Sequence, residues 1–235
     1  MGRGGARSLL CEFGRVAVLL LVDNISGLSR AQRRIAQWIA WNPDQPGIAL
    51  LDVHIPDRNR TRRLDALIWS AQRCVAVTAT GFRSRQNGTL VVPPTGPLRM
   101  SNGRKADISG NTLLSDPVTR TRVNSAATKT WLERATGTRC VLYDLLLITV
   151  VRGQIVTAID APDLPPKTDI LVEDFDLFQH YFQRFAELSP RWTSARIATV
   201  IDSLGLSYLY DGDADLLAEA MGETTSSARI FSFPH

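Results

Sequence analysis

Two short apolar runs joined by a polar turn stand out in the hydrophobic pattern of the chain. Residues 64–69 and 75–77 are bounded by Arg, Ser, Gln and Gly, as β-strands are. Both runs are apolar on both faces, which predicts neighbouring strands at the centre of a sheet that is covered on both sides. Asp65 lies inside the first run, where a carboxylate is costly unless it is paired or binds a metal.

The remaining pattern predicts helices and strands in a mixed order. Ser29 and Gln32 have the spacing of a capping box, followed by apolar residues at helical spacing. Ser115-Asp116-Pro117 marks a second helix start, with Gly137 just past its end. The predicted helices are 29–41, 116–135, 174–188, 194–204 and 214–221. The further predicted strands are 48–55, 89–92 and 170–172, and residues 139–151 form one long strand or two abutting ones.

This order predicts a mixed α/β fold with a central mixed β-sheet flanked by helices. Within the strand at 48–55, alternation places Leu51, Val53 and Ile55 on one face, and Asp52 and His54 on the other. Residues 56–63 are interpreted as a basic connection and residues 93–111 as a long irregular loop.

The N-terminal residues 9–22 form an apolar element that we interpret as a helix. Its longest apolar run, residues 16–22, is too short to span a bilayer, which takes roughly 20 residues. Glu12 and Arg15 interrupt it, and no small-x-small cleavage site follows, so a cleaved signal is not predicted. Two interpretations stay open: a helix or strand packed on the domain, or a segment docked on a membrane or a protein partner.

The length and composition bound the organisation of the chain. With 235 residues, 44% of them hydrophobic, the chain can form one domain over residues 1–190 with a helical C-terminal extension packed on it over residues 191–235. Cys11, Cys74 and Cys140 are far apart and resemble reduced thiols more than a disulfide or zinc framework. This usage favours a cytoplasmic location, with peripheral membrane association as an alternative, and no metal or cofactor is predicted.

The charge is distributed unevenly along the chain. Residues 1–139 carry 21 Lys and Arg beside 9 Asp and Glu, a net +12, whereas residues 140–235 carry 6 and 14, a net −8. Such asymmetry points to an anionic partner for the first half, or to two halves that neutralise each other.

Six arginines are the candidate anion-binding residues, with nucleic acid backbone and a protein partner both left open. A phosphate-binding face and a solvated basic edge are equally compatible with the pattern. Few aromatic residues are interleaved, so stacking on single-stranded bases is not indicated. The six are Arg58, Arg60, Arg62, Arg63, Arg83 and Arg85.

The chain resembles the nuclease-related domain (NERD) family, which is placed in the PD-(D/E)xK restriction-endonuclease-like superfamily. The resemblance covers roughly residues 28–190 and rests on four short stretches and on the strand, short strand and helix order of residues 139–188. The stretches are Arg-Arg-Ile-Ala at 33–36, Leu-Asp-Val-His-Ile-Pro at 51–56, Leu-Asp-Ala-Leu-Ile at 64–68 and Val-Ala-Val at 75–77.

The resemblance implies a metal-dependent nuclease site that this sequence only partly retains. The family needs an Asp on the first central strand, with a Glu and a Lys on the next, to hold Mg²⁺ and stabilise the phosphorane. Asp65 matches the Asp, but Thr78 and Thr80 occupy the Glu and Lys positions. A Gly-Glu pair expected at the start of the first helix reads Ala31-Gln32.

We therefore interpret the chain as a non-catalytic, nuclease-like binding or scaffold protein. Asp65 is either a relic metal ligand or a buried acid paired with Arg62, Arg63 or a backbone donor. The alternatives are a metal-dependent nuclease with a rearranged site, and a peripheral adaptor of a membrane or cell-envelope complex. A second carboxylate near Asp65 would favour the first alternative, and an exposed apolar patch over residues 9–22 the second.

Overall fold

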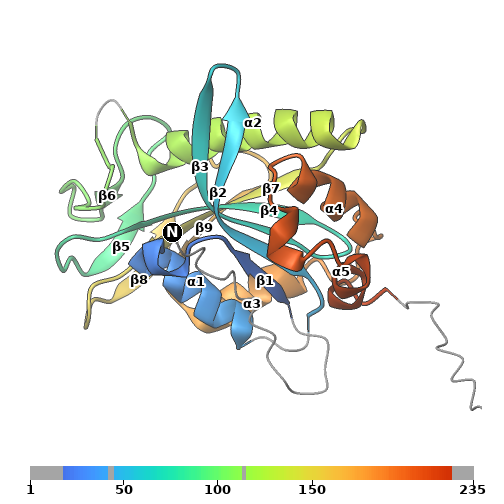
Figure 1. Cartoon of the computed structure of the whole chain (residues 1–235). Coiled ribbons are helices and arrows are strands. Elements are labelled where there is room, and N and C mark those ends of the chain that lie inside the picture. Colours follow the sequence, from blue (N-terminus) through green and yellow to red (C-terminus); the bar gives the residue numbers. More distant parts are fainter. Residues whose placement is uncertain (1–17, 42–44, 113–114, 224–235) are drawn as a thin grey trace, which may run out of the picture.

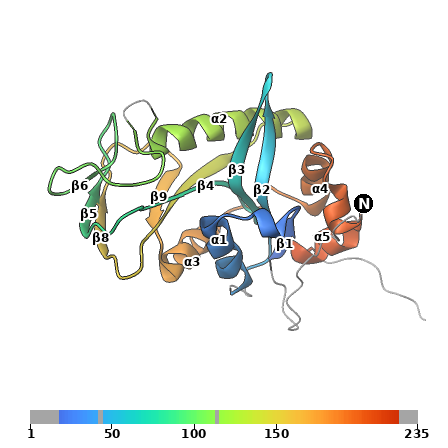
Figure 2. The same ribbon diagram turned by 60° about the vertical axis from the view of Figure 1, so that its left-hand side comes forward.

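The molecule has three layers, with a mixed β-sheet between two sets of helices (Figure 1). The computed structural model describes residues 18–41, 45–112 and 115–223. Helices α1 (Arg30–Ala40) and α3 (Phe175–Gln183) cover one face of the sheet. Helices α2 (Pro117–Thr136), α4 (Ser194–Asp202) and α5 (Ala214–Ala220) cover the other face (Figure 2). This arrangement confirms the predicted fold class.

The central sheet has the strand order β1-β2-β3-β4-β7-β9. The pairs β2–β3 and β3–β4 are antiparallel, and the pairs β1–β2, β4–β7 and β7–β9 are parallel. The predicted central pair, β3 and β4, does lie in the interior of this sheet. The strands are β1 (Leu19–Val22), β2 (Ile48–Asp57), β3 (Arg60–Trp69), β4 (Cys74–Gly81), β7 (Leu142–Thr149) and β9 (Thr168–Val172).

A second, three-stranded sheet lies beyond the ends of β4 and β7, and the sequence indicated only one of its strands. β5 (Gly88–Val91) lies between β6 (Arg99–Met100) and β8 (Val156–Asp160). The prediction missed β8 because its side chains are intermediate or exposed and carry no apolar run. β6 is two residues long within the stretch that was interpreted as irregular.

The helix ends follow the predicted capping signals. The Ser29 side chain accepts a hydrogen bond from the Gln32 N–H, and Gln32 Oε1 accepts one from the Ser29 N–H at 2.7 Å, which completes the capping box. Asp116 caps α2, and Gly137 ends it with a left-handed φ of 67°.

The predicted helical extension, residues 191–235, shares the core of the sheet in its described part. Ile197 of α4 and Leu217 of α5 are fully buried in the same cluster as Leu21 and Trp69. The indole of Trp192 makes an edge contact with that of Trp69, with ring centroids 6.2 Å apart. These helices therefore complete one face of the sheet.

The apolar N-terminal element is a strand where it is described, so the preferred helix is wrong there and the alternative of a packed strand is confirmed. β1 pairs in parallel with β2, and all four of its side chains are buried. Leu19 and Leu21 pack on one face of the sheet, and Leu20 and Val22 on the other. An unbroken apolar run fits a helix or a doubly covered strand equally well, and the free edge of β2 decided between them. Residues 9–17 lie outside the described residues.

The stretch at 56–63 is part of a long hairpin, which corrects its interpretation as a connection. β2 and β3 stay paired as far as Asp57 and Arg60, and only Arg58 and Asn59 form the turn. The hairpin projects past α2 (Figures 1 and 2).

The predicted side-chain alternation of β2 is also wrong at one position. Leu51 packs on the α1 side of the sheet, whereas Val53 and Ile55 pack on the α2 side. Asp52 lies between them with a φ of 53°, a left-handed conformation that reverses which face the following residues occupy. This reversal turns the end of the hairpin toward α2.

The face of α2 that covers the sheet is unusually polar. Thr121, Asn124 and Thr128 are buried on it. Beneath them on β7 lies Asp144, which is 8% exposed and whose Oδ1 has no hydrogen-bond partner among the described residues. Burial raises the pKa of Asp144 to about 6, although hydrogen bonds to Ser125 and Thr168 oppose the shift.

We expect Asp144→Asn to stabilise the protein above pH 6 but not near pH 4. The folded pKa of about 6 exceeds the ordinary value of 3.8, so the folded state binds more protons between these values. Stability therefore falls as the pH rises through this window, by up to about 3 kcal/mol, and the amide removes that loss. Urea unfolding of both proteins from pH 4 to pH 8 measures the difference. The exposed substitution Asp163→Asn is the control, and a pH-independent difference for Asp144→Asn would contradict the expectation.

Candidate functional site

Asp65, Thr78 and Thr80 line one pocket of about 440 Å³. Strands β3 and β4 supply these three residues, and the start of α1 and the first half of α2 supply the opposite wall. The full lining is Ser29, Arg30, Ala31, Arg63, Asp65, Thr78, Ala79, Thr80, Gly81, Ser109, Arg120, Asn124 and Thr149.

Asp65 is anchored by a backbone donor, one of the predicted alternatives. Its Oδ2 accepts a hydrogen bond of 2.7 Å from the Ala79 N–H of the next strand. Arg62 and Arg63, the other predicted partners, pair with Asp57 and Asp52 instead. Burial raises the pKa of Asp65 above its ordinary value, and the Ala79 hydrogen bond and the charges of Arg120 and Arg63 only partly offset this.

The two threonines are built into the pocket wall. Thr78 is 3% exposed and Thr80 is 7% exposed. The Thr80 hydroxyl donates to the carbonyl of Ser109 at 2.7 Å, and the Thr149 hydroxyl donates to the carbonyl of Thr80 at 3.2 Å. A Cβ at Gly81 would lie 2.3 Å from Thr149 Oγ1, so glycine is needed for this approach of β4 to β7.

Asp52 is the acid nearest to Asp65 in the hairpin, and its carboxylate is already occupied. It pairs with Arg63 Nε and accepts a hydrogen bond of 3.2 Å from Gln32 Nε2. Gln32 is fully buried and also serves the capping box of α1. Among the described residues, no three His, Cys, Asp or Glu side chains are grouped so that they could hold a metal ion.

Three arginines line the pocket, two of which the sequence did not single out. Arg30 stands at the start of α1, Arg63 on β3 and Arg120 in the first turn of α2. Arg120 has no ion-pair partner within the described part of the chain, and its guanidinium lies against Gly110. Asn124 donates to the carbonyl of Arg63 at 3.3 Å. The i, i+4 spacing of Arg120 and Asn124 was the available signal for a shared helix face.

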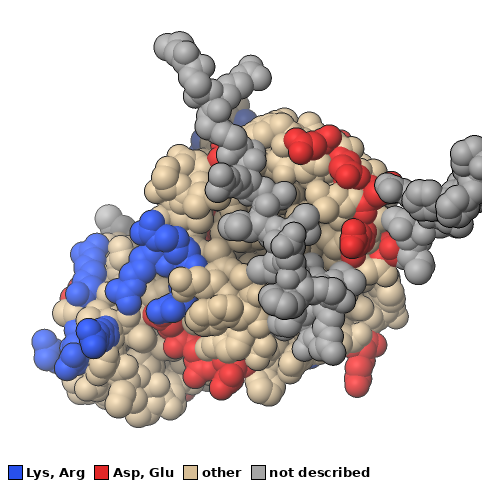
Figure 3. Space-filling model, turned by 60° about the horizontal axis from the view of Figure 1, so that its bottom comes forward, with Lys and Arg blue, Asp and Glu red and all other residues tan. Residues whose placement is uncertain are grey.

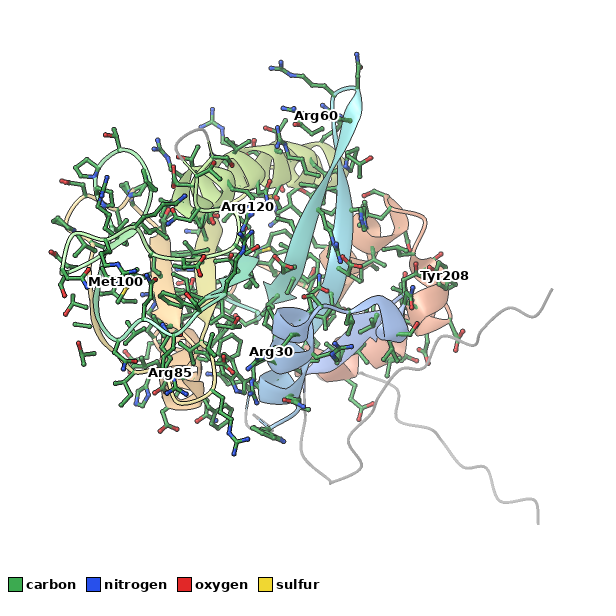
Figure 4. All side chains as sticks on the ribbon, turned by 90° about the vertical axis from the view of Figure 1, so that its left-hand side faces the viewer. Arg30, Arg60, Arg85, Met100, Arg120 and Tyr208 are labelled. Carbon is green, nitrogen blue, oxygen red and sulfur yellow. The ribbon has the colours of Figure 1, made fainter. Side chains whose placement is uncertain are left out.

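The six candidate arginines fall into separate places rather than onto one face. Arg58, Arg60 and Arg62 line a second pocket of about 410 Å³ between the hairpin and α2. Arg63 lies in the Asp65 pocket, and Arg83 lines a third pocket with Arg104 and Lys105. Arg85 donates to the carbonyl of Arg152 at 2.8 Å. Figure 4 shows Arg60 near the hairpin tip and Arg85 at the other end of the molecule.

The charge asymmetry of the sequence persists in the folded molecule. On the face in Figure 3, Lys and Arg gather at one end, and Asp and Glu lie at the middle and the other end. Among the ion pairs of the described residues, only Arg34–Glu173 joins the basic first half to the acidic second half. Pairing between the halves therefore neutralises little of the charge.

The fold and site define a mixed α/β protein with an arginine-lined pocket around one partly buried carboxylate. Comparison of the chain with protein-family models, with curated proteins and with solved structures returned no match. Within the described residues, no helix has the length and apolar character needed to cross a bilayer.

Proposed function

We propose that this chain is a non-catalytic, nuclease-like binding protein whose Asp65 pocket holds a phosphodiester group. The proposal rests on one observation above all. The pocket brings together Asp65, Thr78 and Thr80 with Arg30 and Arg120, so the expected catalytic positions offer hydroxyls while the surrounding wall offers positive charge.

The residues favour binding over hydrolysis. A two-carboxylate magnesium site with a general cation needs charged groups where Thr78 and Thr80 stand, and a neutral hydroxyl is a weak ligand beside a carboxylate. The Thr80 hydroxyl is also committed to Ser109. Asp52 could replace the missing acid only by giving up its bonds to Arg63 and Gln32.

The electrostatics of the pocket suit an anion. The guanidinium of Arg120 is unpaired within the described chain, and Arg30 makes only a 3.4 Å hydrogen bond to the Val150 carbonyl. The start of α1 lines the same wall and adds the positive end of its dipole. The negative charge of Asp65 opposes binding of an anion, and burial raises the pKa of Asp65 in spite of the nearby Arg120 and Arg63.

The NERD-like resemblance and a cytoplasmic setting belong to the same proposal. The shared pocket of Asp65, Thr78 and Thr80 supports the resemblance, because the family's chemistry needs those positions side by side. Cys74 and Cys140 are free and buried, which supports a reducing compartment. The membrane-adaptor alternative loses part of its basis, since residues 19–22 are buried in the sheet.

We expect Asp65→Asn to strengthen binding of a single-stranded oligonucleotide severalfold in the presence of EDTA. The substitution removes the negative charge that opposes Arg30 and Arg120. The double variant Arg30→Gln/Arg120→Gln should instead weaken oligonucleotide binding by about tenfold and make the affinity depend less on salt concentration. Fluorescence anisotropy with a labelled oligonucleotide measures both. Arg191→Gln, an exposed arginine that lines none of the three arginine-bearing pockets, is the matched control.

The same substitution separates this function from the nuclease alternative. Wild-type protein with Mg²⁺ or Mn²⁺ should leave both DNA and RNA uncut. Metal-dependent cleavage that disappears in Asp65→Asn would establish a rearranged catalytic site. Binding that weakens in Asp65→Asn would also contradict the proposal, because the carboxylate would then be helping to hold the ligand or its metal.

A further inference from the structure

The distal part of the β2–β3 hairpin forms an arm, residues 53–64, that no other strand of the described chain flanks. β1 pairs with β2 only as far as Leu51, and β4 pairs with β3 only from Ala66. The arm rises past α2, and its tip stands clear of the body of the molecule (Figures 1 and 4).

The arm is firmly held at its base and exposed at its tip. Val53, Ile55 and Leu64 are at most 1% exposed and pack in the core cluster that contains Trp131 of α2. The residues from Arg58 to Thr61 at the tip are all exposed. The buried base and the strand pairing of the arm reduce the ordering that its tip would need on binding.

The surface between the arm and α2 is basic. Arg58, Arg60, Arg62 and Arg134 line the 410 Å³ pocket there, and Asp57 is its only acid. Asp57 is itself paired with Arg62 at 2.6 Å and with Arg60 at 3.3 Å, and the hydrogen bond from Arg62 is the main cause of its lowered pKa. Arg58 has no such partner among the described residues.

The exposed side of α2 extends this basic surface. Arg122 and Lys129 are exposed there, and the small residues Ala126 and Thr130 leave room for close approach. Glu133 is the nearest acid of the helix, and its Oε1 accepts a hydrogen bond of 3.1 Å from the Cys140 N–H.

We propose that the arm enters the major groove of a duplex nucleic acid while α2 contacts the flanking phosphates. This deepens the proposed function and rests on it, since both place a phosphodiester backbone beside α2. The major groove admits a two-stranded β-ribbon and is about 8.5 Å deep. From Ile55 to Arg58 the strand advances by about 10 Å, which matches that depth.

The chemistry of the tip favours a duplex over the other anionic partners. Residues 53–64 contain no Phe, Trp or Tyr, so they offer no platform for stacking single-stranded bases. Arg58 and Asn59 are of the two residue types that pair with guanine and adenine edges in the major groove. An acidic peptide would fit the charge of the groove but would leave the projecting tip without a contact.

The test variant is Arg58→Glu/Arg60→Glu. The control is Lys167→Glu/Arg191→Glu, which changes the net charge by the same amount at two exposed positions outside the three arginine-bearing pockets. With a duplex of about 20 base pairs, the arm variant should lose at least about tenfold in affinity and reduce the salt slope by about 2, and the control should not. Wild-type protein should also protect guanine N7 atoms, which lie in the major groove, from dimethyl sulfate. Arg58→Gln/Arg60→Gln should give a smaller loss of the same kind.

Each contrary result has a distinct meaning. Unchanged duplex affinity in the arm variant, or wild-type binding without guanine protection, overturns the arm proposal. An acidic peptide that displaces the duplex and depends more strongly on Arg58 and Arg60 overturns it in favour of a protein partner. The proposed function fails separately, if Arg30→Gln/Arg120→Gln leaves oligonucleotide binding unchanged.

Discussion

Leu20→Asp is expected to destabilise the protein by about 4 kcal/mol or more, a large part of the total stability of an ordinary domain. Leu20 is 7% exposed in β1 and packs against the α1 side of the sheet. The change removes a buried side chain and places a carboxylate in an apolar cluster. Chemical unfolding of both proteins measures the loss.

The control for this prediction is Ile25→Asp, a few residues further along the chain. Ile25 is 45% exposed, so the same kind of substitution should change stability by no more than about 1 kcal/mol. If Leu20→Asp unfolded at the same denaturant concentration as the wild type, residues 19–22 would not be packed in solution. That result would favour the interpretation of this segment as a docking element for a membrane or a protein partner.

Trp69→Ala should cost about 3–5 kcal/mol, which is usual for truncating a large buried aromatic side chain. Trp69 is fully buried at the end of β3, where it touches Trp192. This contact ties the central strand to the C-terminal helices. The loss should therefore appear as one cooperative transition at lower urea, with no separate unfolding of α4 and α5.

Two further variants test whether the stability loss in Trp69→Ala comes from the buried aromatic contact. Trp69→Phe should recover much of the lost stability, because Trp69 Nε1 has no hydrogen-bond partner in the described part of the chain and its removal breaks no such bond there. Trp41→Ala, at a tryptophan that is 57% exposed, should cost far less than Trp69→Ala. A biphasic transition in Trp69→Ala would show that residues 191–223 fold as a separate unit.

Local sequence signals determined the elements whose causes are themselves local. The capping box of Ser29 and Gln32 and the Asp116-Pro117 start of α2 fixed two helix starts, because their hydrogen bonds join residues at most three positions apart. The central position of β3 and β4 followed from side chains that are apolar on both faces. The anchoring of Asp65 was foreseen only as one of several options, since a buried acid must find a partner but the sequence does not say which.

Long-range contacts decided what the sequence left open. Residues 19–22 became a strand because the edge of β2 was free to pair, and β8 formed on a neighbouring strand without an apolar pattern of its own. The left-handed Asp52 reversed the facing of the residues that follow it in β2, and neighbouring positions on β3 placed Arg62 and Arg63 in different pockets. The sequence alone gives the number and type of charged residues. Which of them share a site depends on how distant segments pack, as for Arg30, Arg63 and Arg120. Local patterns specify how a segment buries its own side chains, whereas a site is assembled by the packing of distant segments, which no local pattern encodes.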